Sequence, residues 1–227
     1  GMGGSSLGPE VIAGVLDAEL ERSAPRLAML DSTDPGAITR MRERLDPRRT
    51  LVIASSKSGG TLETALLLGF FEEWLRQSWG DAAGERLVAV TDPGSALEAR
   101  AREHGFRDVI AGEPTIGGRF SVLSPFGLVP AAAIGVDLER LLAPLEPMTE
   151  ACRDLPANSN PGVALGLLLA VAALEGRDKV WLESEAPLGG LGAWLVQLLA
   201  ESTGKDGQGL VPRDRVPPAA DPAQGAR

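Results

Sequence analysis

The chain has 227 residues, of which 44% are hydrophobic and 23% charged, which is ordinary for a globular protein with a sizeable core. Its 31 acidic and 22 basic side chains give a net charge of -9, and without a basic cluster it lacks the charge pattern of a nucleic-acid-binding protein. A single cysteine, Cys152, excludes an intramolecular disulfide and a zinc site built from cysteines, and the longest apolar run, residues 162–174, is too short to cross a bilayer. We therefore expect a cytoplasmic protein with neither membrane nor nucleic acid as a partner.

A glycine-rich segment opens the chain. Residues 1–9 are Gly-Met-Gly-Gly-Ser-Ser-Leu-Gly-Pro, and apolar residues follow at helical spacing from Val11 to Leu20. We place Pro9 in the first turn of this helix, where a missing N–H is tolerated. In a doubly wound fold such a loop follows a strand, so we expect the chain to start one strand late; alternatively, residues 1–6 are the remnant of a tag.

Strands and helices then alternate as far as residue 110. The predicted strands are residues 26–31, 50–55, 86–91 and 106–110, and the predicted helices are residues 35–45, 61–78 and 95–104, with Asp34 as the N-cap of the first. This alternation predicts an α/β fold, a mostly parallel sheet flanked by helices on both faces, whose ligands bind beyond the carboxyl ends of the strands. In the helix at 61–78, one apolar face is expected from Leu62, Ala65, Leu66, Phe70, Trp74 and Leu75.

The loop between the strand at 50–55 and the next helix has an unusual make-up. It carries the hydroxyls of Ser56, Ser58 and Thr61, the ammonium of Lys57, and two adjacent glycines that let backbone N–H groups approach a ligand. A helix N-terminus offers unpaired N–H donors and a partial positive charge, so this loop is suited to a phosphate or another oxyanion. The alternative is a turn whose hydroxyls only cap the helix.

Two further segments carry candidate residues. Residues 113–130 are rich in glycine and proline and contain Arg119 among small neighbours, which suits a guanidinium lying over a cleft; a capping or salt-bridging arginine is the alternative. A helix is expected over residues 125–146. His104, the single histidine, ends a charged helix, where a cationic side chain favours the C-terminus, and we expect this role rather than catalysis.

A polar break at residues 156–161 precedes what is predicted to be a second α/β unit. Its expected elements are a helix at 161–174, a strand at 178–183 and a helix at 190–200. The last helix leads to Glu201 and Lys205, a carboxylate and an ammonium at a helix terminus. Residues 213–227 have too little apolar content to pack, and we expect them to be disordered.

Four motifs in this order resemble the glucose-6-phosphate isomerase family. They are Gly1-Met-Gly-Gly-Ser-Ser-Leu-Gly-Pro, Ser56-Lys-Ser-Gly-Gly-Thr-Leu-Glu-Thr, Gly117-Gly-Arg-Phe-Ser and Glu201-Ser-Thr-Gly-Lys. The exact residues of these motifs are most similar to those in the isomerase half of bacterial transaldolase/glucose-6-phosphate isomerase fusions. The resemblance covers residues 1–212.

The resemblance implies a pair of sugar-isomerase (SIS) domains, with residues 1–155 as the first, lacking its first strand, and 156–212 as the start of the second. It implies interconversion of glucose 6-phosphate and fructose 6-phosphate through an enediolate, with Glu201 as the base and Arg119 beside the reacting carbons. Gly4 and Gly118 would lie against the sugar. The implied phosphate ligands are Ser5, Ser56, Lys57, Ser58 and Thr61. No metal or organic cofactor is required, and the full-length parent is expected to be a homodimer.

One departure from the family limits this expectation. The family opens the sugar ring with a histidine and a lysine that follow the Glu201–Lys205 motif, whereas this sequence ends before either could occur, and His104 does not match the motif. We therefore expect a fragment that keeps the phosphate pocket and the base. The alternatives are a non-catalytic sugar-phosphate-binding SIS module and an unstable truncation product with no function of its own.

Overall fold

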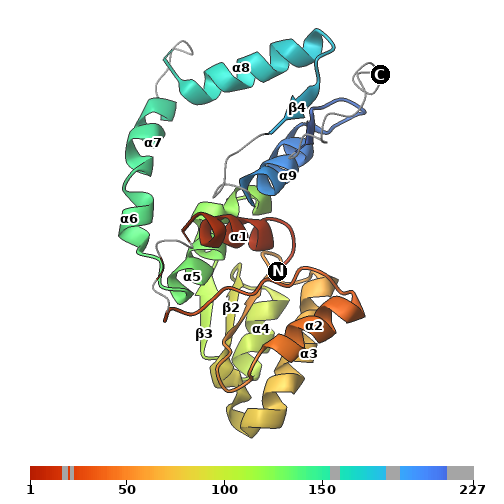
Figure 1. Ribbon diagram of the computed structural model, residues 1–227, viewed down its shortest axis with the longest axis vertical. Helices are drawn as coiled ribbons and strands as arrows, with labels where there is room; N and C mark the ends of the chain where they lie inside the picture. Colours follow the sequence, from red (N-terminus) through yellow and green to blue (C-terminus); the bar gives the residue numbers. More distant parts are fainter. Residues whose placement is uncertain (17–19, 21–22, 154–158, 183–189, 214–227) are drawn as a thin grey trace. The chain divides into compact units, whose positions relative to one another are not determined.

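The computed structural model describes residues 1–16, 20, 23–153, 159–182 and 190–213 (Figure 1). The chain divides into two compact units, Gly1–Val136 and the residues from Asp137 onward. The predicted domain boundary between residues 155 and 156 lies outside the described residues, as does residue 214 onward of the predicted tail. Arg213, where that tail was expected to begin, instead ends a short strand.

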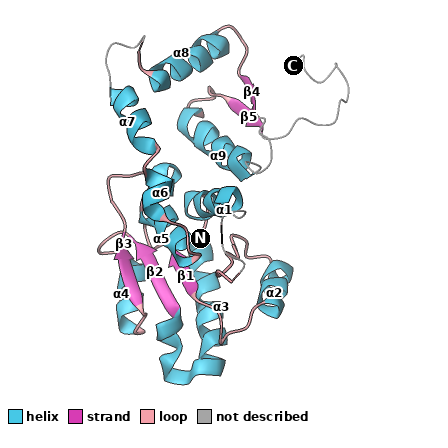
Figure 2. Cartoon of the chain, turned by 60° about the vertical axis from the view of Figure 1, so that its left-hand side comes forward, coloured by secondary structure: helices cyan, strands magenta, loops and turns pink. Residues whose placement is uncertain are grey.

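The first unit is organised by a parallel sheet of three strands, β1 (Val52–Ser55), β2 (Leu87–Thr91) and β3 (Asp108–Ala111), in the order β1-β2-β3 (Figure 2). Ser55 pairs with Val90, and Thr91 pairs with Ala111, so the three strands end at one edge. All five residues of β2 are buried, as expected for a central strand covered on both faces.

Helices cover both faces of the sheet, as predicted. On one face, α3 (Leu62–Trp79) and α4 (Ala96–Glu103) pack against Ala54, Leu87 and Ala89 in the main apolar cluster. Side chains alternate along a strand, so Val88 and Val90 point to the opposite face. There α5 (Pro125–Ala133) contacts β2, and α1 (Gly4–Leu16) packs on α5. The sequence therefore predicted the layer architecture correctly.

The sequence also located most of the elements that surround the sheet. Helix α2 spans Pro35–Arg44, and its predicted N-cap Asp34 accepts a hydrogen bond from the Ala37 amide at 2.7 Å. A 3₁₀ helix, η1 (Gly80–Arg86), was not predicted; it connects α3 to β2 and is held by the Arg86 guanidinium, which lies 3.8 Å from the centre of the Trp79 ring.

The strand predicted at residues 26–31 does not form. These residues have no regular structure, although Leu30 still packs against the main apolar cluster. A strand needs a hydrogen-bonded neighbour, and a cleft of about 670 Å³, lined by residues 23–30 on one side and 50–55 on the other, separates this segment from β1. Within the described residues β1 is consequently an edge strand.

Two helix predictions were wrong in detail. Helix α1 already begins at Gly4, so Pro9 lies inside the helix rather than in its first turn. The single helix expected at 125–146 is interrupted, because Gly135 adopts a positive φ of 89° after α5, and Asp137 then caps a new helix, α6 (Leu138–Leu142), by accepting from the Arg140 amide. Helix α7 (Leu145–Arg153) follows.

The buried face of α3 also differs from the prediction. Leu62, Leu66 and Phe70 are exposed by 67%, 57% and 40%, while Trp74 and Leu75 are buried as expected. The remaining buried residues of the helix are Thr64, Leu67, Leu68, Phe71 and Glu72. Between residues 65 and 71 the helix is apolar on nearly every side, so periodicity could not select the face that packs on the sheet.

Glu72 is a buried carboxylate, with 5% of its side chain exposed. It accepts a hydrogen bond from Arg100 at 2.8 Å and contacts the Nδ1 atom of His104, the C-cap residue of α4. Burial by itself would raise the pKa of Glu72, but the hydrogen bonds and charges of His104 and Arg100 outweigh it and hold this pKa below its usual value. His104 thus ends the helix, as predicted, and in addition pairs with a buried acid.

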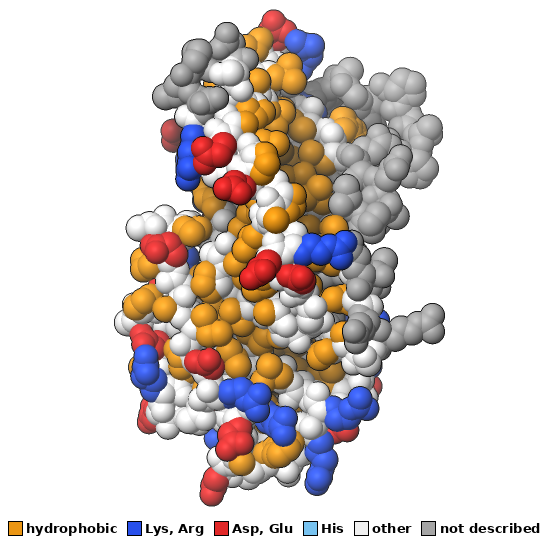
Figure 3. Space-filling view, turned by 90° about the vertical axis from the view of Figure 1, so that its left-hand side faces the viewer, with side chains coloured by type: hydrophobic (Ala, Val, Ile, Leu, Met, Phe, Trp, Pro, Cys, Tyr) orange, Lys and Arg blue, Asp and Glu red, His pale blue; other side chains and the backbone are white. Residues whose placement is uncertain are grey.

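The second unit contains α8 (Pro161–Leu174) and α9 (Leu191–Thr203), together with a two-stranded parallel sheet of β4 (Lys179–Trp181) and β5 (Val211–Arg213). Helix α8 is strongly apolar, yet Leu165, Leu168 and Leu174 are at least half exposed, and hydrophobic side chains are visible on the surface in Figure 3. Among the described helices, none combines the length and apolar character needed to span a membrane.

Candidate active site

The candidate site lies at the edge of the first unit where the three strands end. The loops that leave these strands are tied by backbone hydrogen bonds. The Ser56 amide donates to Val90 O at 3.1 Å, the Asp92 amide to Lys57 O at 3.1 Å, and the Gly112 amide to Thr91 O at 2.7 Å. The loops after β1, β2 and β3 therefore form one connected rim, the place where open parallel sheets bind ligands.

The loop after β1 folds around its own hydroxyls. Ser56 is buried, and its Oγ donates to Thr61 Oγ1 at 3.2 Å, while the Gly60 amide donates to Ser58 Oγ at 3.3 Å. Gly59 has a φ of 67°, and a Cβ there would lie 2.8 Å from the Leu97 amide nitrogen. Both the left-handed backbone and the close approach of α4 require glycine at this position.

The N-terminus of α3 differs from those of the other described α-helices that have a polar N-cap residue. Its N-cap residue, Thr61, makes no side-chain cap hydrogen bond. In contrast, the side chain accepts from the helix backbone at every other described α-helix with a Ser, Asp or Asn N-cap, namely Asp34, Ser95, Ser124, Asp137 and Asn160. The hydroxyl-rich loop therefore reaches a helix N-terminus whose cap hydroxyl is not used for capping, which favours the anion-binding prediction over the capping alternative.

The N-terminal loop and the 117–121 segment adjoin this rim. Ser5 Oγ donates to Met2 O at 2.9 Å and lies 3.3 Å from Ser55 O at the end of β1. A Cβ added to Gly4 would lie 2.1 Å from Gly118 O, closer than any side chain allows, so the two backbones touch. The Gly4–Ser5 pair thus contacts both the end of β1 and Gly118, which is far away in the sequence.

Arg119 lies in a 3₁₀ helix, η2 (Gly118–Leu123), that follows the loop after β3. Its guanidinium is 4.7 Å from the centre of the Phe120 ring. The turn is fixed by Ser121, whose Oγ donates to Gly118 O at 2.7 Å, and Ser124 Oγ donates in turn to Ser121 O at 2.6 Å. The glycine-rich segment around Arg119 is therefore a tightly hydrogen-bonded turn that leads into α5.

Comparison with known proteins identifies the family to which this chain is related. A family model described as phosphoglucose isomerase matches residues 1–211. The chain belongs to the phosphoglucose isomerase family. Glucose-6-phosphate isomerases of Thermus thermophilus and Rubrobacter xylanophilus are 39% and 35% identical to it, over 100% and 95% of this chain and 52% of each relative. The chain thus spans about half the length of these relatives.

Solved structures agree with this assignment. The crystal structure of a hypothetical protein from Thermus thermophilus matches with a TM-score of 0.83 and 36% identity, over 93% of this chain and 50% of that one. A glucose-6-phosphate isomerase from Chlamydia trachomatis matches with a TM-score of 0.78 and 28% identity, over 95% and 42%. The fold is therefore the SIS-type parallel-sheet fold that the resemblance implied.

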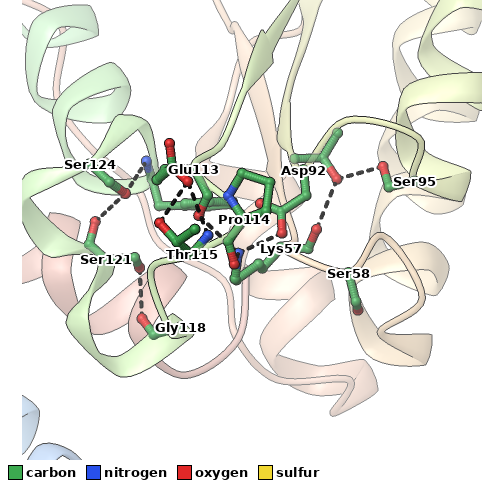
Figure 4. Close-up of polar contacts among 12 residues, drawn as sticks. Lys57, Ser58, Asp92, Ser95, Glu113, Pro114, Thr115, Gly118, Ser121 and Ser124 are labelled. Atoms are coloured by element: carbon green, nitrogen blue, oxygen red, sulfur yellow. Dashed lines mark hydrogen bonds and ion pairs between the residues drawn. The ribbon is translucent and has the colours of Figure 1, made fainter.

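Lys57 lies differently from a simple anion ligand. Its Nζ contacts Asp92 Oδ2 at 2.5 Å and donates to the carbonyl oxygens of Glu113 at 3.0 Å and Pro114 at 3.2 Å (Figure 4). The Glu113 carboxylate accepts from the Thr115 hydroxyl and amide, which lower the pKa of Glu113, and the charge of Lys57 adds to this effect. The phosphoglucose isomerase motif thus contains a lysine that joins three loops.

Glu201 belongs to the second unit, whereas Arg119 and every predicted substrate-binding residue belong to the first. It lies in the last turn of α9, and Lys205 Nζ donates to Glu201 O at 2.9 Å and to Ser202 O at 3.3 Å, which satisfies carbonyl groups at the helix end. In the described residues, no group of three or more His, Cys, Asp or Glu side chains could hold a metal ion.

Sequence reasoning missed two residues of the rim, Asp92 and Glu113. Asp92 directly follows the strand predicted at residues 86–91 but was not recognised as a candidate site residue. One available signal was its position, because a carboxylate directly after a buried parallel strand lies at the ligand-binding edge. No comparable signal existed for Glu113, whose carbonyl group rather than its side chain contacts Lys57.

Proposed function

We propose that this chain provides the phosphate-binding edge and the catalytic base of an aldose-ketose isomerase that interconverts glucose 6-phosphate and fructose 6-phosphate. The observation that carries the proposal is the meeting of the Gly4–Ser5, Ser56–Thr61 and Gly118–Arg119 segments at one edge of the sheet in a phosphoglucose isomerase family chain. The sugar phosphate would be held by hydroxyls of Ser5, Ser56, Ser58 and Thr61 and by the N-terminus of α3.

The proposed chemistry needs one base and one cation. Isomerisation removes a proton from C2 of the sugar and returns it to C1 through an enediolate, so a single carboxylate near both carbons serves both steps. We assign this role to Glu201. Arg119 stabilises the developing oxyanion, because a guanidinium stays charged and can direct its N–H donors at the new charge. Phosphate binding away from the reacting carbons provides orientation.

A non-catalytic sugar-phosphate-binding module is the second candidate. It is favoured by one observation, that all proposed substrate ligands belong to the first unit while the base belongs to the second. The two candidates differ in turnover, since a binding module has no need for Glu201.

The isomerase proposal also includes residues 156–212 as the start of a second SIS domain, and a homodimer as the active state of the whole protein.

A thermal-shift titration of the 227-residue chain tests the binding part of the proposal. Fructose 6-phosphate should stabilise the chain in a saturable manner, because a ligand that binds only the folded state raises its stability by RT ln(1 + [L]/Kd), about 2.7 kcal/mol at a hundredfold excess over Kd. Free fructose is the control and should produce no shift. Equal shifts with both sugars, or no shift with either, would contradict a phosphate site at Ser56–Thr61.

A further inference from the structure

Lys57 uses its full hydrogen-bonding capacity within the protein. An ammonium group has three N–H donors, and the Lys57 Nζ faces three acceptors, Asp92 Oδ2, Glu113 O and Pro114 O, at 2.5, 3.0 and 3.2 Å (Figure 4). The side chains of Lys57 and Asp92 are only 25% and 18% exposed. A phosphate that bound this ammonium would have to displace one of three partners from a partly buried position.

Asp92 contacts both the side chain and the backbone of Lys57. The Asp92 carboxylate pairs with the Lys57 ammonium, and the Asp92 amide donates to Lys57 O at 3.1 Å. The same Lys57 carbonyl oxygen lies 3.3 Å from the Thr91 hydroxyl. Lys57 follows β1 and Asp92 follows β2. The pair therefore locks the loop after β1 against the loop after β2 through one charged and one backbone contact.

The same ammonium reaches the loop after β3. Glu113 and Pro114 present their carbonyl oxygens to it from a turn that Glu113 itself closes, because its carboxylate accepts from the Thr115 amide at 3.0 Å and hydroxyl at 2.7 Å. The chain continues directly into η2, which carries Gly118 and Arg119. Lys57 thus contacts the segment that leads into the turn of η2 that carries Gly118 and Arg119, the Arg119 turn.

We infer that Lys57 and Asp92 are positioning residues, which fix the Arg119 turn relative to the phosphate loop, and that the Lys57 side chain is not a phosphate ligand. The inference rests on the proposed function, and it revises the role of phosphate ligand that the family resemblance implies for Lys57. Asp92 itself cannot bind the phosphate, because like charges repel. Its contribution to substrate binding is made entirely through Lys57 and the carbonyl groups of residues 113 and 114.

The variant Asp92→Asn separates this role from direct phosphate binding by the sign of its effect. If Lys57 were a ligand, neutralising Asp92 would release the ammonium, remove a negative charge near the anion, and tighten binding. If the pair positions the loops, the same change should weaken fructose 6-phosphate binding by about tenfold, equivalent to roughly 1.4 kcal/mol. Isothermal titration of the 227-residue chain measures this, and tighter binding by Asp92→Asn would overturn the inference.

A second ligand distinguishes positioning from general destabilisation. Inorganic phosphate needs only the loop at Ser56–Thr61, so its dissociation constant should change by less than about threefold in Asp92→Asn, in contrast to the tenfold change for fructose 6-phosphate. Equal losses for both ligands would overturn the inference. Asp178→Asn is the matched control, because Asp178 pairs with Lys179 at 2.6 Å in a partly exposed Asp–Lys pair of the second unit. It should leave both constants unchanged.

Amide hydrogen exchange tests the positioning role of Lys57 and Asp92 independently of any ligand. Amides of residues 112–121 should exchange about tenfold faster in Asp92→Asn, while those of α2 should keep their wild-type rates. Lys57→Met, which removes the other half of the pair, should have the same effect and replaces Asp92→Asn if that variant does not fold. Unchanged exchange in a folded variant would overturn the inference that Lys57 and Asp92 position the loops. A wild-type chain that binds neither ligand would instead contradict the proposed function alone.

Discussion

Gly4 and Gly14 lie on the same helix but in opposite surroundings. A Cβ at Gly4 would meet Gly118 O at 2.1 Å, a backbone atom that cannot move aside, while a Cβ at Gly14 would meet nothing within 4 Å. Both glycines have ordinary helical backbone, so conformational freedom does not explain either. What distinguishes them is the close approach of α1 to the Arg119 turn.

We therefore expect the substitutions Gly4→Ala and Gly14→Ala to change stability in opposite directions. Gly4→Ala should lower the free energy of unfolding by about 1–3 kcal/mol, because the added methyl group forces two backbones apart. Gly14→Ala should raise it by roughly 0.5–1 kcal/mol, because alanine loses less backbone entropy in a helix. Urea unfolding of both variants measures this, and a stabilised Gly4→Ala would show that Gly4 does not contact Gly118.

Helix starts show how one element differs from another that looks alike in sequence. Ser95 caps α4 by accepting from the Glu98 amide at 3.1 Å, whereas Thr61 begins α3 without a side-chain cap bond. Hydroxyl residues at both positions satisfy the same sequence rule. Only the structure reveals that one hydroxyl stabilises its helix and the other lies in the loop assigned to the phosphate.

The two hydroxyls should consequently affect different measurements. Ser95→Ala should lower stability by about 1 kcal/mol, the usual value of an N-cap. Thr61→Ala should weaken fructose 6-phosphate binding by about tenfold, as for the loss of one charge-assisted hydrogen bond of roughly 1.4 kcal/mol, whereas Ser95→Ala should leave this binding unchanged. Chemical unfolding and calorimetric titration of both variants provide the comparison. Binding by Thr61→Ala equal to wild type would remove Thr61 from the proposed site.

At the scale of the whole molecule, the proposed machinery is distributed over two units. The substrate ligands and Arg119 belong to the first unit and Glu201 to the second. The relatives that the chain matches are about twice as long. Binding of the phosphate and removal of the proton are therefore separable properties, which variants in different units should affect separately.

Glu201→Gln tests the second of these properties. The chain incubated with fructose 6-phosphate in D2O should exchange a C1 proton of the sugar through the enediolate, and Glu201→Gln should slow this exchange by at least about a hundredfold, the usual contribution of a general base. The ligand-induced thermal shift should remain. Glu146→Gln, an exposed glutamate of the same unit, is the control. Exchange by Glu201→Gln at the wild-type rate would mean that another group is the base.

Sequence periodicity and loop chemistry by themselves determined the α/β architecture, most element positions and the Asp34 cap, and the resemblance of four ordered motifs indicated the family. They could do so because β-branched runs, helical spacing and glycine- or hydroxyl-rich loops act locally, over a few residues. The same local signals failed at residues 26–31, where a strand pattern has no hydrogen-bonded neighbour, and in α3, where an apolar surface nearly all round leaves the buried face undecided.

Only the tertiary structure decided which distant residues touch. Gly4 against Gly118, Glu72 with Arg100 and His104, and Lys57 with Asp92 and the carbonyl groups of residues 113 and 114 are contacts between segments far apart in the chain. A lysine in a phosphate-binding motif looks the same in sequence whether its ammonium points to a ligand or to a neighbouring loop. The direction depends on the acceptors that the folded chain brings within 3.2 Å of Nζ.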